Sequence, residues 1–172
     1  TAEDLARHLI KNTCVTTIRI SCKRLEQKDI GRQRKLTVLS TLIWAIRQNT
    51  SIESIEIEDT DISHQLAHAL SFQLLAKKQT LKNVALIQCQ FIGQSALAIL
   101  FLGMQHSQSI RNLIFQSCDL GGGGRDQQKE EGGFSGGDPS NVEIIASALP
   151  LMKLTSLSLV DVNFPTRECL LY

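Results

Sequence analysis

The sequence predicts an α/β fold, a solenoid in which strand–helix units stack side by side. A frame of eleven residues, apolar at places one, four, six and eleven, occurs five times, starting at Val15, Ile52, Leu81, Ile110 and Leu154. The steps from 52 to 81 and from 81 to 110 are both 29 residues, while the outer two steps are 37 and 44. Apolar residues alternate with others at places four to six, which is typical of a strand with one face buried. We therefore expect about five strands in a curved, parallel sheet on the concave face, with helices on the convex face.

The ninth place of the frame lies where the chain leaves each strand. A polar side chain here can bond the backbone groups of the turn, which lose their sheet partners at this point. The frame has Lys23, Thr60, Cys89, Cys118 and Val162 at this place. Because lysine and valine depart from the pattern, we expect the turn to be least regular in the first and last units.

The frame resembles L-x-x-L-x-L-x-x-N/C-x-L, the pattern of the leucine-rich repeat family, and the 29-residue unit resembles its ribonuclease-inhibitor-like subfamily. The resemblance covers nearly the whole chain. Repeats of that family act as inhibitors, as ligand-sensing segments of intracellular receptors and as scaffolds. The resemblance therefore implies a non-catalytic protein–protein interaction module. A regulator of a GTPase is an alternative, because GTPase-activating proteins that act on Ran share this repeat type. A structural spacer within a larger receptor or scaffold is another.

Helical spacing of apolar residues predicts helices over 2–12, 36–46, 63–78, 93–104 and 141–149. In the first of these, Leu5, Leu9 and Ile10 share one face. Asn12 and Asn49 stand at equivalent helix ends, where a residue that tolerates the left-handed conformation helps. The first helix precedes the first strand, and residues 165–171 resemble the start of a further helix. We therefore expect residues 1–172 to be a single leucine-rich repeat domain that is truncated at both ends of a longer array.

Residues 121–140 interrupt the pattern. They hold eight of the chain's eleven glycines and few apolar residues. Such a composition does not offset the entropy that ordering costs, so we expect a flexible Gly-rich insertion. Its tetraglycine is not followed by the Gly-Lys-Ser/Thr ending of a phosphate-binding loop.

Composition and motifs indicate no catalytic centre. No apolar run approaches the roughly 18 residues that a membrane span needs. The five cysteines are odd in number and form no C-x-x-C pair, which favours a reducing, cytoplasmic location. Residues 1–50 carry a formal charge of +6 and residues 51–172 carry −5, a polarity too modest to imply nucleic acid. The pair His64 and His68 lacks the glutamate of a zinc-protease motif and a third ligand. We expect no metal, no cofactor and no enzymatic activity.

The solvent-facing side chains of the strands form the best candidate site. Places one, four and six of the frame point into the core, so places three, five, seven and eight face solvent on the concave side. This arrangement sets acidic residues beside apolar ones, a combination typical of protein-binding surfaces, although isoleucine and valine are also ordinary strand formers. The expected partner-binding residues are Arg19, Glu56, Glu58, Asp59, Ala85, Ile87, Ile114, Gln116 and Val160.

Overall fold

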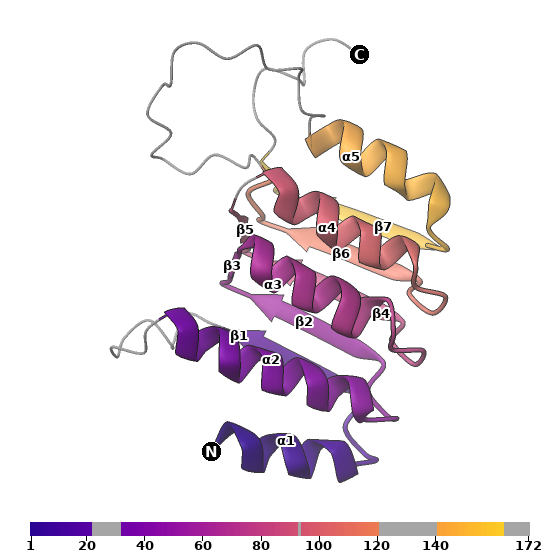
Figure 1. Ribbon diagram of the computed structural model, residues 1–172. Coiled ribbons are helices and arrows are strands. Elements are labelled where there is room, and N and C mark those ends of the chain that lie inside the picture. The colour runs from indigo at the N-terminus through magenta and orange to yellow at the C-terminus, as the bar shows by residue number, and fades with distance from the viewer. Residues whose placement is uncertain (22–31, 93, 121–140, 164–172) are drawn as a thin grey trace.

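The computed structural model describes residues 1–21, 32–92, 94–120 and 141–163. It confirms the predicted α/β solenoid, with a five-stranded parallel sheet on one side and helices on the other (Figure 1). The strands lie in the order β1 (Thr17–Ser21), β2 (Ser54–Glu58), β4 (Asn83–Ile87), β6 (Asn112–Gln116) and β7 (Ser156–Val160). A two-stranded sheet joins β3 (Asp61–Ile62) to β5 (Gln90–Phe91).

Each strand is followed or preceded by a helix that packs against the helix of the next unit. The helices are α1 (Ala2–Lys11), α2 (Arg32–Gln48), α3 (His64–His68), α4 (Gln94–Gln105) and α5 (Asn141–Ala148). The predicted helix over 63–78 begins as α3, with Ser63 as its N-cap, and continues as a π-helix, η2 (Ala69–Leu75). A short 3₁₀-helix, η3 (Leu149–Leu151), extends α5.

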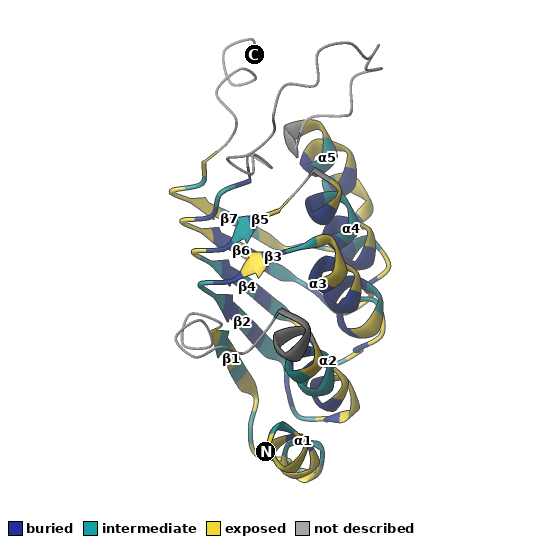
Figure 2. Cartoon of the chain, turned by 60° about the vertical axis from the view of Figure 1, so that its left-hand side comes forward, coloured by how far each residue is buried: buried dark blue, intermediate teal, exposed yellow. Residues whose placement is uncertain are grey.

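The strands pair in the register that the frame predicts, so equal places form columns across the sheet. Place six, for example, aligns Ile20, Ile57, Leu86, Phe115 and Leu159. In the three central units, places one, four, six and eleven are all buried between the sheet and the helices (Figure 2). The ring of Phe115 stacks on that of Phe101 from α4, with centroids 6.0 Å apart. The shared core therefore runs through the stack rather than within any one unit.

Burial is weaker in the two outer strands than the frame implies. Ile18 and Ile20 of β1 are only partly buried, and Leu159 of β7 is 43% exposed. In α1, Ala6 is the buried residue, whereas Leu5 is 56% exposed although we expected it on the same apolar face as Leu9. Because α1 packs against α2 on one side, only part of its apolar surface is covered.

The turns differ from the expectation in two respects. Asn12 has φ −76° and ψ 127°, and Asn49 is likewise not left-handed, so the predicted role of these residues is wrong. The left-handed residues instead occupy place eight, with φ near 50° at Asp59, Gln88, Ser117 and Asp161. Since Asp161 shares this conformation, place eight of the last unit has the same backbone conformation as in the three central units, contrary to the prediction of a less regular turn. The first turn, the Gly-rich segment 121–140 and the expected helix at 165–171 lie outside the described residues.

Candidate functional site

The predicted site residues lie together on the side of the sheet away from the helices, which we call the concave strand face. Parallel pairing in register places them in two columns. Place five contributes Arg19, Glu56, Ala85, Ile114 and Ser158, and place seven contributes Ser21, Glu58, Ile87, Gln116 and Val160. Asp59 follows β2 in the turn, where its backbone N–H donates to the carbonyl of Ile87 at 3.0 Å.

One end of this face holds an ion pair that the sequence pattern does not reveal. Arg19 Nε lies 2.6 Å from Glu56 Oε2, and its guanidinium is 4.0 Å from Glu58 Oε2. The hydrogen bond to Glu56 raises the pKa of Arg19, so the arginine stays charged. The predicted acidic cluster is therefore partly neutralised from the neighbouring strand, 37 residues away in sequence. Since the pair is exposed to solvent, we expect it to orient a partner more than to hold the fold together.

A ladder of hydrogen-bonded polar side chains runs along the start of the strands, at place three. Asn83 Nδ2 donates to Ser54 Oγ at 2.7 Å, and Asn112 Nδ2 donates to Asn83 Oδ1 at 2.6 Å. Thr155, at place two of the last unit, extends the ladder by donating from Oγ1 to Asn112 Oδ1 at 3.3 Å. The sequence signal for this ladder is a polar residue at place three of every unit, but the bonds themselves depend on the register.

Between the ion pair and β7 four outward side chains are apolar, and polar Gln116 lies among them. Ile114 is 37% exposed and Val160 is 43% exposed, while Ala85 and Ile87 are half-buried beside them. We call these four residues the apolar patch. Its side chains come from three neighbouring strands, β4, β6 and β7. A rigid sheet thus presents apolar side chains to solvent within reach of charged and polar ones.

Other candidate sites have structural explanations. The ring of His68 contacts that of Phe72, with centroids 4.8 Å apart, and His64 is exposed at the start of α3. Among the described residues, no three His, Cys, Asp or Glu side chains gather closely enough to hold a metal ion. No helix in the described ranges is both long enough and apolar enough to cross a membrane.

Comparison with solved structures supports the fold, and it does not show a function. No family model matches the sequence, and no curated protein matches it. Among solved structures, the C-terminal domain of a tropomodulin from Caenorhabditis elegans is similar, with a TM-score of 0.59 and 17% sequence identity. The likeness covers 97% of this chain and 85% of that one. At this identity it shows a leucine-rich-repeat-like α/β fold, and membership of the ribonuclease-inhibitor-like subfamily stays a prediction.

Proposed function

We propose that this chain is a non-catalytic module that binds another protein on its concave strand face. The apolar patch of Ala85, Ile87, Ile114 and Val160 is the observation that carries the proposal. Exposed apolar side chains on an ordered surface, flanked by charge, are what a partner needs for a buried contact with a polar rim. We further propose that the module belongs to a longer repeat array in a reducing, cytoplasmic location.

Several side chains of this face are held in place by hydrogen bonds, which supports binding. The ladder from Ser54 to Thr155 holds the polar side chains on one flank, and the pair of Arg19 and Glu56 holds those on another. Side chains that are already fixed lose less conformational entropy when a partner docks. We expect the apolar patch to provide most of the affinity, and the exposed charges of Glu56 and Glu58 to affect orientation and association rate.

The test is a comparison of proteins captured by the immobilised wild-type chain and by single variants. Ile114→Asp should abolish capture, because a docked partner would bury an unpaired carboxylate. The control is Gln73→Asp, which adds the same side chain at an exposed position on η2. Both variants should remain folded, as circular dichroism would show, since neither side chain points into the core between the sheet and the helices.

The affinities of the wild-type chain and its variants for a partner identified in this way then test whether the partner binds the concave strand face. Glu58→Lys should weaken binding moderately, and the effect should shrink as ionic strength rises. If Gln73→Asp abolishes binding and Ile114→Asp does not, the partner docks on the helices and the proposed site is wrong. A GTP hydrolysis assay with the captured partner separates a binding module from the alternative of a GTPase regulator.

A further inference from the structure

The connections that lead from each helix to the next strand carry a large excess of positive charge. They correspond to residues 7–16, 44–53, 73–82, 102–111 and 146–155, which are equivalent stretches of ten residues in the five units. Together they contain eight Lys or Arg and one Asp or Glu, a formal charge of +7. We call this surface the basic edge; it follows the right-hand side of the stack in Figure 1. Its cations are Arg7, Lys11, Arg47, Lys77, Lys78, Lys82, Arg111 and Lys153.

Acidic side chains concentrate at the opposite edge, where strands lead into helices. Glu58 ends β2, Asp59 follows it and Asp61 begins β3. Asp119 and Asp161 occupy the turns after β6 and β7. Acidic residues also occur in the first turns of α1 and α5. The start of α2 is the exception, because Arg32, Arg34 and Lys35 stand there. In the other units the fold separates charge across the width of the solenoid, a separation that the small net charge of +1 conceals.

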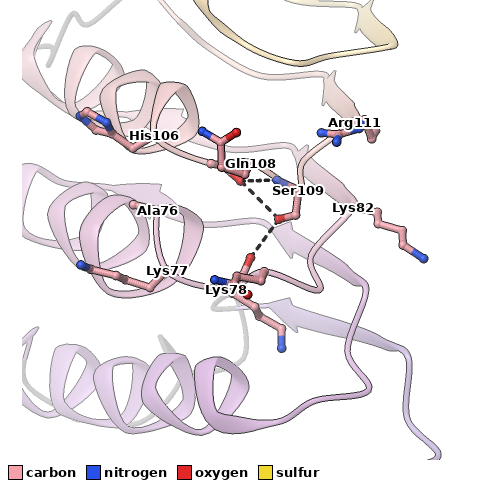
Figure 3. A pocket seen from close by; sticks show the side chains of 10 residues that line it. Ala76, Lys77, Lys78, Lys82, His106, Gln108, Ser109 and Arg111 are labelled. Atoms are coloured by element: carbon pink, nitrogen blue, oxygen red, sulfur yellow. Dashed lines mark hydrogen bonds between the residues drawn. The ribbon is translucent and has the colours of Figure 1, made fainter.

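Two hollows open on the basic edge, and no acidic residue lines either of them. The larger, of about 540 Å³, lies between the ends of η2 and α4 and is lined by Lys77, Lys78, Lys82, His106 and Arg111, with amide and hydroxyl side chains between them (Figure 3). The second, of about 470 Å³, is lined by Arg7, His8, Lys11 and Asn12 at the end of α1. Both hollows thus combine positive charge with space for a ligand.

Helix stability explains only part of this charge. Arg47 and Lys11 lie in last turns, where cations complement the helix macrodipole. The buried ammonium of Lys78 donates to the carbonyl of Asn49 at the end of α2, at the cost of a pKa lowered by burial. Lys82 and Arg111, however, lie beyond the helices, at the second place of the frame. Within the basic edge, Glu53 is the one acidic partner, 2.8 Å from Lys82.

We propose that the basic edge binds an acidic segment of a protein. Neighbouring helices pack about 8–10 Å apart, so Lys77 and His106, equivalent residues in the turns just after η2 and α4, repeat at about that interval. An extended peptide advances about 3.3 Å per residue, so acidic residues three apart match this spacing. Gln79 and Gln108 are both exposed in the larger hollow, and their amides suit a peptide backbone, although Gln108 Oε1 already accepts from Lys153 Nζ. Tracks for single-stranded nucleic acid add aromatic platforms to cations, and no Phe, Tyr or Trp lines this hollow.

The experiment measures fluorescence anisotropy of a labelled peptide, Glu-Ser-Gly repeated five times, titrated with the whole chain. Labelled pentadecathymidylate and a peptide with Gln in place of Glu serve as comparison probes. The wild-type chain should bind the acidic peptide in preference to both, and more weakly as salt rises. The double variant Lys77→Gln with Arg111→Gln should raise the Kd about tenfold, because charge complementarity supplies the attraction.

The matched control is a double variant at the opposite edge that changes the net charge by the same amount as Lys77→Gln with Arg111→Gln. Gln65→Glu with Ser95→Glu alters exposed residues in the first turns of α3 and α4. It should change the Kd less than about threefold, because its charges lie more than a Debye length of about 10 Å from the basic edge. No binding by the wild type, an equal loss in both double variants, or tighter binding of the oligonucleotide would overturn the proposal. Ile114→Asp should leave peptide binding unchanged, which distinguishes this surface from the concave strand face.

Discussion

At the scale of single residues, the turns after the strands depend on two adjacent places of the frame. Place eight is left-handed in four units although none of its residues is glycine, a conformation that costs non-glycine residues about 1–2 kcal/mol. Place nine offsets part of this cost. Cys89 Sγ donates to the carbonyl of Ile57 at 3.3 Å, and Cys118 Sγ donates to that of Leu86 at 3.2 Å. In the preceding unit Thr60 performs a similar role, donating to the carbonyl of Glu58 at 2.8 Å.

These contacts predict which thiols react. Cys14 is exposed, whereas Cys89 and Cys118 are buried. The hydrogen bond with Cys118 and burial together raise the pKa of the Cys89 thiol, so little of its reactive thiolate forms near neutral pH. The hydrogen bond with Cys89 lowers the pKa of the Cys118 thiol to about 7, so slow labelling of Cys118 depends on its burial. The test uses a variant with Cys22→Ser and Cys169→Ser, treated with a thiol reagent at pH 7.5, about one unit below an ordinary cysteine pKa. Cys14 should be labelled quickly, and Cys89 and Cys118 only after denaturation. Fast labelling of all three, measured by mass spectrometry, would contradict the buried turn position.

At the scale of elements, α4 and η2 approach unusually closely. Ser71 in η2 is fully buried, and its hydroxyl has no hydrogen-bond partner among the described residues. It faces Gly103 in α4, where an added Cβ would lie 2.2 Å from Ser71 Oγ and 2.5 Å from Ser71 Cα. The backbone N–H of Ala76 donates to the carbonyl of Ser71 at 2.9 Å, the spacing of a π-helix. Glycine in α4 is therefore required by the neighbouring backbone rather than by its own conformation.

Gly103→Ala should destabilise the protein by about 1–3 kcal/mol, because the two backbones must move apart to admit the methyl group. In an exposed helix the same change would stabilise by about 1 kcal/mol, so the sign of the effect tests the contact. Urea unfolding followed by circular dichroism gives the free energy. As a control, Leu102→Ala at the adjacent, exposed position should have an effect within about 0.5 kcal/mol. A stabilising Gly103→Ala would show that α4 and η2 lie further apart.

At the scale of the whole molecule, burial depends on how many neighbouring units a side chain has. Leu86 and Leu159 are both leucines at place six of the frame. Leu86 in the central strand is fully buried, but Leu159 in the last described strand is 43% exposed. A repeat cannot cover its own apolar strand face, so the contribution of each core residue varies along the stack.

This gradient predicts different costs for one substitution. Leu86→Ala should cost about 2–5 kcal/mol, and Phe115→Ala about 3–5 kcal/mol, because each leaves a cavity in the shared core. Leu159→Ala should cost about 1 kcal/mol, since only about half of this residue is buried. Chemical denaturation of the three variants under identical conditions measures these values. Equal costs for the two leucines would show that Leu159 is covered in solution.

Segment 121–140 gives a further prediction at this scale, made from composition alone. Replacing it with a five-residue Gly-Ser linker should change the free energy of unfolding by about 1 kcal/mol, because closure entropy varies by about 0.6 kcal/mol for each doubling of loop length. Limited proteolysis of the wild type should cut first in this segment. Strong amide protection between Gly121 and Gly137 would instead indicate an ordered element.

The sequence by itself determined the repeat, the strands, their register and the central core, because a period of two and a step of 29 residues are local properties of the chain. It also placed Ile114 and Val160 on the solvent-facing side, since alternation along a strand fixes the side. Only the tertiary structure decided the pair of Arg19 with Glu56, the contact of Ser71 with Gly103 and the exposure of Leu159. Each of these depends on which element packs beside the residue, and that neighbour comes from another unit of the solenoid.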